Sequence, residues 1–211
     1  MDAKTEKDLN EAYLEIQKGN YEKGIQLTQR YLNFKDQETQ LLAYTVSAIG
    51  YFESGNYMEA KEHYKKCADM TNDNQDWFNV CTSATLAKDF ELGSMAFQKA
   101  MDPFSNQTSN ISGPMMTYYY SQALADAGNF SKCREMLEPL KDLYKQIKIS
   151  DTHYLTTAGM PMLQNFLDVV KKIYNGTKDK SIEAILNDLS SGIDEEGQEI
   201  IKQFKAELLR G

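Results

Sequence analysis

The side chains that most often carry out chemistry are few in this sequence and widely separated. His63 and His153 are the only histidines, and they lie 90 positions apart. Neither is accompanied by the partners of a nucleophilic triad or by ligands at zinc spacing. A glycine-rich phosphate loop of the Walker or dinucleotide type is also missing from the sequence. We therefore expect no enzymatic activity, no catalytic residues, no metal and no cofactor, and we interpret the many carboxylates as surface charge.

The cysteines and the lack of long apolar segments bear on the compartment. Cys67, Cys81 and Cys133 are an odd number and lie in segments with a helical period, which favours reduced, buried thiols over a disulfide or a metal site. Residues 1–6 contain no apolar run, and no stretch approaches the roughly 18 apolar residues of a membrane helix. We expect a cytoplasmic protein without a signal peptide or a membrane anchor.

Composition restricts the class of partner. The 211 residues include 31 acidic and 23 basic side chains, which gives a formal net charge of -8. Nucleic acid is a poor candidate, because phosphate binding requires clustered Lys and Arg. We therefore expect the partner to be another protein or a peptide segment, with no contact to nucleic acid or membrane.

A short phrase of glycine, asparagine and an aromatic residue recurs along the chain and defines the elements that would position any site. It reads Gly19-Asn20-Tyr21, Gly55-Asn56-Tyr57 and Gly128-Asn129-Phe130, with a less regular copy at Lys88-Asp89-Phe90. Equivalent positions lie 36, 33 and 40 residues apart, which is a spacing typical of repeat proteins that stack into a solenoid.

Each phrase predicts a helix, a tight turn and a second helix, because apolar residues recur on both sides of it with a period near 3.6. The glycine is expected to end the first helix in the left-handed conformation, and the asparagine side chain to cap the second. A small residue follows three positions after each aromatic residue and is expected where the two helices touch; these residues are Gly24, Ala60, Gly93 and Cys133.

These units resemble the tetratricopeptide repeat (TPR), a helix hairpin of about 34 residues. The second unit carries the pattern of that family in Tyr44, Ala48, Tyr51, Gly55, Tyr57, Ala60 and Tyr64. The other units carry parts of it, at Ala12, Gly19, Tyr21, Gly24 and Thr28, at Trp77, Val80, Cys81, Phe90, Gly93, Phe97 and Ala100, and at Tyr120, Ser121, Gly128, Phe130, Cys133 and Leu137. The resemblance implies an all-α fold, a right-handed α-solenoid of antiparallel helix hairpins, with four TPR-like hairpins in residues 1–148.

Residues 149–211 keep the helical period but lose the phrase. Two apolar stripes predict a degenerate fifth hairpin, at Leu163, Phe166, Leu167, Val170 and Ile173 and at Ile182, Ile185, Leu186 and Leu189. The segment from Asp194 to Leu209 is expected to form a helix that caps the end of the solenoid. A polar loop is expected from Ser105 to Gly113, between the third and fourth units.

The resemblance also implies a binding surface, because the first helix of each hairpin lines a concave groove in which proteins of this family commonly hold peptides. Counting back from each turn gives the candidate groove residues Val46, Ile49, Gln75, Phe78, Asn79, Thr82, Met115, Tyr118, Tyr119 and Gln122. None of these is charged, so the groove is expected to accept an apolar or amphipathic segment, with Asn79 and Gln122 able to bond its backbone. The carboxylate clamp of the family is not expected, because its register positions read Leu9, Tyr13, Val46, Gln75 and Asn79.

Residues 103–125 contain no charged side chain, which indicates either burial or a contact surface. The three consecutive tyrosines at 118–120 span too much of a helix circumference for all of them to be core, so at least one is expected to reach the groove.

Two functions follow from these patterns. The first is a non-enzymatic adaptor or chaperone-like module that binds an apolar or amphipathic peptide or helix of another protein in the concave groove. The alternative is a structural subunit or self-associating component of a larger assembly, which would use its convex face or its C-terminal helix and form a homo-oligomer.

Overall fold

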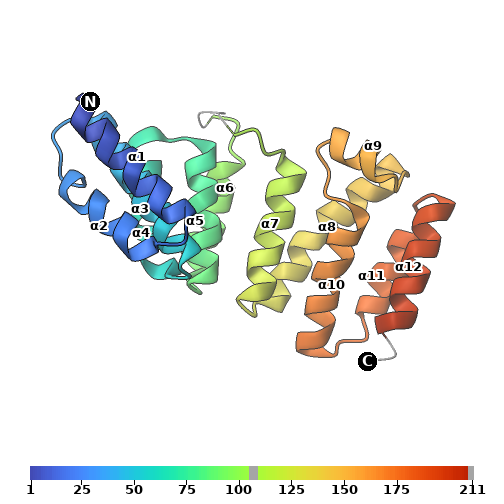
Figure 1. The fold of residues 1–211 in the computed structure, drawn as a ribbon. Helices are drawn as coiled ribbons and strands as arrows, with labels where there is room; N and C mark the ends of the chain where they lie inside the picture. The colour runs from blue at the N-terminus through green and yellow to red at the C-terminus, as the bar shows by residue number, and fades with distance from the viewer. Residues whose placement is uncertain (105–108, 209–211) are drawn as a thin grey trace. The chain divides into compact units, whose positions relative to one another are not determined.

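A computed structural model describes residues 1–104 and 109–208 of the chain (Figure 1). The described residues form α-helices, one short 3-10 helix and connecting turns, as expected for an all-α protein. They divide into two compact units, Met1–Ser109 and Asn110–Gly211. The expected division after residue 148 follows the repeat pattern and stays a prediction. Ser105 of the expected loop and Leu209 of the expected capping helix lie outside the described residues.

The first unit consists of helices that pack in consecutive pairs. Helix α1 packs on α2, α3 on α4 and α5 on α6, while α2 also contacts α3 and α4 contacts α5. Its elements are α1 (Ala3–Gln17), α2 (Tyr21–Thr28) with the 3-10 helix Gln29–Tyr31, α3 (Gln37–Glu53), α4 (Tyr57–Thr71), α5 (Asn74–Leu86) and α6 (Phe90–Ala100). This arrangement agrees with the predicted helix pairs.

The second unit begins with one further pair, α7 and α8, and continues with shorter helices. Helix α10 contacts both α7 and α8, α11 contacts α8 and α12, and α12 contacts α10. The elements are α7 (Gly113–Asp126), α8 (Phe130–Ile147), α9 (Thr152–Thr157), α10 (Leu163–Thr177), α11 (Ile182–Ser190) and α12 (Glu195–Leu208). The apolar stripes predicted α10, α11 and α12, whereas the short helix α9 was not predicted.

The turn between paired helices has the predicted backbone geometry. Gly19, Gly55 and Gly128 have φ values of +84°, +78° and +81°, in the left-handed region. The N–H group of the next residue donates to the carbonyl oxygen five positions before it, at 2.8–2.9 Å, in the bonds Asn20 to Glu15, Asn56 to Tyr51 and Asn129 to Leu124. This bond closes the end of the first helix in each case.

The same turn forms at two places where the phrase is altered or missing. Lys88 occupies the glycine position with φ +64°, which costs a non-glycine residue about 1–2 kcal/mol. The N–H of Asp89 still donates to the carbonyl of Ala84 at 2.8 Å. After α9, Gly159 has φ +71°, and the N–H of Met160 donates to the carbonyl of Leu155 at 2.8 Å. This fifth turn was not predicted, because no asparagine or aromatic residue follows Gly159.

The predicted caps of the second helices form at Asn56 and Asn129 but not at Asn20. The side chain of Asn56 accepts from the N–H of Glu59 at 3.4 Å, and that of Asn129 accepts from the N–H of Lys132 at 3.3 Å. At Asn20 the prediction was wrong: the side-chain amide instead donates to Glu15 at 2.9 Å. A carboxylate is a stronger acceptor than a neutral oxygen, which favours this bond.

The small residues lie where paired helices touch, as predicted. A Cβ atom on Gly24 would lie 2.8 Å from the carbonyl oxygen of Ala12 and 2.5 Å from the Ile16 side chain. A Cβ on Gly93 would collide with the Thr85 hydroxyl. Ala60 and Cys133 are completely buried. A larger side chain at these positions would separate the helices.

The cysteines are free and buried, in agreement with the sequence analysis. Burial raises the pKa of the Cys67 and Cys133 thiols to about 12, so neither is a nucleophile at neutral pH. None of the described helices combines the length and apolar character that crossing a bilayer requires.

The close approach at Gly24 predicts that Gly24→Ala destabilises the protein by about 1–3 kcal/mol, because the new methyl group meets a backbone carbonyl that cannot move aside. This cost exceeds the gain of about 1 kcal/mol that alanine brings to a helix interior. Urea denaturation followed by circular dichroism measures the difference. Gln26→Ala, on the same helix, serves as the control and should change stability by less than about 0.5 kcal/mol. A Gly24→Ala protein as stable as the wild type would contradict the packing at this position.

Candidate functional site

The predicted groove residues of the first unit lie on α3 and α5 and are largely covered by their own unit. Val46 and Phe78 are each only 4% exposed. Ile49, Gln75, Asn79 and Thr82 are half-buried. The apolar members of this row therefore contribute mainly to the core of the unit.

The polar members of the row on α5 are bonded within the chain. The Gln75 side-chain amide donates to Asn79 Oδ1 at 3.1 Å, and the Ser109 hydroxyl donates to Gln75 Oε1 at 2.6 Å. The Ser109 N–H donates to Asn74 Oδ1 at 3.0 Å. The Thr82 hydroxyl is directed to the carbonyl oxygens of residues 78 and 79. Ser109 thus bonds Gln75, one of the residues of the predicted groove.

The predicted residues of the second unit lie on α7, and most of them also pack internally. Tyr118 is buried, and its hydroxyl accepts a hydrogen bond from the Asn165 amide of α10 at 3.2 Å. Tyr120 is buried, whereas Tyr119 is 39% exposed and its ring lies 5.1 Å from that of Tyr118. Met115 and Gln122 are half-buried. Tyr119 is therefore the tyrosine of this run that reaches the surface.

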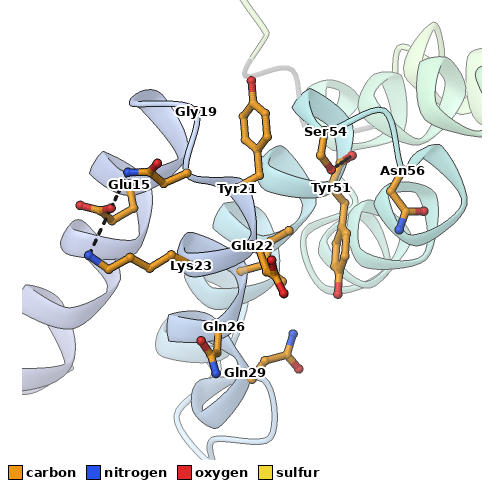
Figure 2. A pocket seen from close by; sticks show the side chains of 12 residues that line it. Glu15, Gly19, Tyr21, Glu22, Lys23, Gln26, Gln29, Tyr51, Ser54 and Asn56 are labelled. Atoms are coloured by element: carbon orange, nitrogen blue, oxygen red, sulfur yellow. Dashed lines mark hydrogen bonds and ion pairs between the residues drawn. The ribbon is translucent and has the colours of Figure 1, made fainter.

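A cleft, which we call the α2 cleft, lies elsewhere in the first unit (Figure 2). Its volume is about 1020 Å³. It is bounded by the end of α1, by α2 and by the end of α3, and it is lined by Glu15, Gly19, Asn20, Tyr21, Glu22, Lys23, Ile25, Gln26, Gln29, Tyr51, Ser54 and Asn56. No residue of the predicted groove belongs to this lining.

Two glycines and a short helix shape the α2 cleft. Gly24 lets α2 lie against α1, and Gly50 lets Ile25 of α2 lie against α3, because a Cβ on Gly50 would be 2.8 Å from the Ile25 side chain. Helix α2 has only 8 residues before it continues into the 3-10 helix. Glu22, Gln26 and Gln29 follow one another at helical spacing and therefore present one polar face to the cleft.

Glu15 forms one fixed wall of the cleft, on the side where Figure 2 shows it joined to Lys23. Its carboxylate accepts from the Asn20 amide at 2.9 Å and from the ammonium groups of Lys18 at 3.0 Å and Lys23 at 3.2 Å. These hydrogen bonds, led by the one from Asn20, lower the pKa of Glu15 to about 2. Glu15 is therefore ionised and fully bonded at neutral pH, which suits a structural role rather than proton transfer.

Tyr51 forms the opposite wall and is backed by His63 of α4. The His63 ring lies edge-on to the Tyr51 ring at 5.1 Å and to the Tyr44 ring at 5.3 Å. Its Nδ1 atom is buried and has no hydrogen-bond partner within residues 1–104 and 109–208. Burial lowers the pKa of His63, so the ring is neutral at pH 7.

Apart from the exposed Glu22, the remaining lining of the α2 cleft offers neutral hydrogen-bonding groups. The Gln26 and Gln29 amides each supply donors and an acceptor, and the Tyr21 and Tyr51 hydroxyls supply more. Among the described residues no three His, Cys, Asp or Glu side chains gather closely enough to hold a metal ion. The arrangement is therefore suited to holding a polar chain such as a peptide backbone.

The α2 cleft was not predicted, because binding residues were expected only on the first helix of each pair. The sequence contains one indication of the cleft: Gln26 and Gln29 lie three positions apart on the second helix of the first pair, where the apolar period ends early. These glutamines border a cleft only because α2 is short, and the sequence pattern does not specify the length of α2.

Comparisons with known proteins leave the cleft without an assigned role. Models of protein families, curated proteins and solved structures gave no match to this chain. The geometry alone carries the function proposed below.

The environment of His63 predicts a specific loss of stability on acidification. Protonation of His63 is less favourable in the folded state than in the unfolded chain, where the imidazole has a pKa near 6.5. The free energy of unfolding therefore falls as the pH falls through 6.5 toward the lower pKa of the folded state. His63→Phe keeps an aromatic ring beside Tyr44 and Tyr51 but does not titrate. It should therefore show a smaller loss than the wild type between pH 7.5 and 5, measured by urea denaturation.

His153→Phe provides the matched control, because it makes the same replacement at an exposed position, where no buried imidazole is removed. Superimposable profiles of the wild type and His63→Phe would show that the proposed burial penalty at His63 is absent.

Proposed function

We propose that this chain is a non-enzymatic, cytoplasmic protein–protein interaction module built from TPR-like helix hairpins in a right-handed solenoid. The repeated helix-ending turn supports this proposal, since the same hydrogen bond closes it at Gly19, Gly55, Lys88, Gly128 and Gly159. The small residues at the helix contacts support it as well. Solenoids of this kind commonly serve as binding scaffolds.

The partner proposed for the α2 cleft is an extended peptide segment of another protein. The observation that carries this choice is the neutral, amide-rich lining contributed by Gln26, Gln29 and Asn56 beside Tyr51. A peptide backbone presents one donor and one acceptor per residue, which matches such a lining, and each bond contributes about 0.5–1.5 kcal/mol. A volume of about 1020 Å³ accommodates several residues.

Charge favours a basic residue in that peptide. The chain carries a net charge of -8, and Glu22 lies exposed on the lining of the cleft. Glu15 does not compete, because its carboxylate is already paired with two lysines. A Lys or Arg of the partner would therefore be attracted to Glu22, mainly raising the association rate.

The apolar groove expected from the first helices remains a second candidate, and Tyr119 is the observation that favours it. Tyr119 is 39% exposed, and no charged residue precedes Asp126 in its helix. The α5 part of that row is less favourable, because Gln75 is bonded to Asn79 and Ser109.

Affinity purification of the full chain, followed by binding of peptides from the recovered partner, tests the proposal. The double variant Gln26→Ala/Gln29→Ala removes two hydrogen-bonding amides and should weaken the peptide about tenfold, measured by fluorescence anisotropy. Raising the salt concentration should weaken binding of a peptide that carries Lys or Arg.

Gln17→Ala/Gln98→Ala is the matched control, since it removes two amides from exposed positions outside the cleft and should leave the affinity unchanged. Equal affinity of the cleft variant and the control would reject the α2 cleft as the binding site. If Tyr119→Ala abolishes partner binding and the cleft variant does not, the binding site lies on α7 instead.

A further inference from the structure

One carboxylate of the α2 cleft has no ion-pair partner. Glu22 lines the cleft and is exposed, and it forms no ion pair within the described part of the chain. The other carboxylate on the lining, that of Glu15, lies 3.0 Å from the Lys18 ammonium group and 3.2 Å from that of Lys23. A cationic ligand that enters the cleft therefore meets the charge of Glu22 rather than that of Glu15.

The cation next to Glu22 in the sequence is directed away from it. Lys23 also lines the cleft, but Figure 2 shows its side chain extended to Glu15, whereas the Glu22 side chain is directed to the side where Tyr51 lies. The bonds that Glu15 accepts, led by the one from Asn20, lower its pKa to about 2. Glu15 is therefore ionised at neutral pH, and its pairing offsets the charge of Lys23.

An aromatic ring forms the wall on the Glu22 side of the cleft. Tyr51 is half-buried, and the His63 ring packs edge-on against it at 5.1 Å, which holds it in place. Burial raises the pKa of the Tyr51 hydroxyl, and a hydrogen bond with the Gln29 side chain opposes this rise. That bond joins α2 to α3 at the cleft. Tyr51 thus offers a fixed aromatic surface on which a planar cation can stack.

Gln26 adds a neutral acceptor beside Glu22. It follows Glu22 by four positions on α2, so the two side chains are neighbours on one face of the helix, and both are exposed to the cleft. A guanidinium group carries five N–H donors in one plane, whereas an ammonium group is a compact and strongly hydrated charge. A carboxylate, an amide oxygen and an aromatic ring together therefore match a guanidinium group better than an ammonium group.

We propose that the α2 cleft selects an arginine side chain of its peptide partner. The guanidinium group pairs with the Glu22 carboxylate, donates to the Gln26 amide oxygen and stacks on the Tyr51 ring. This inference rests on the cleft being a peptide-binding site, as proposed above, and adds the side chain that the cleft recognises. A peptide with lysine at the same position should bind about threefold more weakly, because it lacks the planar fork of donors.

The charges near Tyr51 favour a cation, and exposure limits their effect. Glu59 of α4 lies near enough to the Tyr51 hydroxyl to contribute to its raised pKa, after the larger effect of burial. Glu59 therefore adds negative potential on the same side as Glu22. Because Glu22 is exposed, water and salt screen its charge. The ion pair and the stacking together should make an arginine peptide bind about tenfold more tightly than a neutral one.

Amide chemical-shift titration of the full chain, at constant ionic strength, tests the proposal. The probes are capped heptapeptides of glycine and serine whose central residue is arginine, lysine, citrulline or glycine. Citrulline keeps the shape of arginine but carries no charge, so the arginine peptide should shift the amides of Glu22, Gln26 and Tyr51 saturably and bind about tenfold more tightly than the citrulline peptide. Equal affinity of all four peptides at the cleft would overturn the selection of arginine and leave the peptide site standing. No saturable shift with any peptide would overturn both.

Two variants separate recognition from structural damage. Glu22→Gln should abolish the preference for arginine over citrulline, whereas Glu11→Gln, at an exposed glutamate outside the cleft, should retain it. Glu22 lies in the first turn of α2, where its charge also favours the helix. The readout is therefore the ratio of the two affinities, with the melting temperature of each variant measured beside it. A tenfold preference for arginine that survives Glu22→Gln, or one that is lost equally in Glu11→Gln, would overturn the proposal.

Discussion

The hydrogen bond that closes each first helix is the constraint on which the rest of the structure depends. It joins an N–H group to the carbonyl oxygen five residues earlier and requires a left-handed residue between them. Lys88 adopts that conformation at an energetic cost, which shows that the turn is required even where glycine is not available. Because the turn reverses the chain within a few residues, the second helix of each pair is directed back along the first.

Close helix contact follows from this reversal, and the α2 cleft follows from the contact. Gly24 and Gly50 remove the side chains that would hold α2 away from α1 and α3. Helix α2 is also short, and its polar face borders the α2 cleft. Glu15 and Tyr51 occupy the same position relative to their turn glycines, four residues before Gly19 and Gly55, and they form two walls of one cleft.

Many polar side chains of the predicted groove form hydrogen bonds within the chain. Ser109 bonds Gln75, and Asn165 bonds Tyr118, so two expected partner contacts are made internally. Gln26 of α2 differs from them, because it is exposed and lines the α2 cleft. The exposed Glu22 lies on the same lining. This combination of a neutral amide and a negative charge is the basis of the peptide proposed as the ligand.

The sequence by itself determined the helix pairs, their turns and the small contact residues, because these depend on local backbone preferences and on the helical period. Gly55 and Asn56 are residue types that favour the turn, and Ala60 is small enough for the contact between the two helices. The sequence did not determine which polar side chains remain available to a ligand. Gln75 and Gln26 are chemically identical, yet Ser109 bonds the first and the second lines a cleft. Only the tertiary structure decided between them, because availability depends on neighbours that are distant in sequence and on where each helix stops.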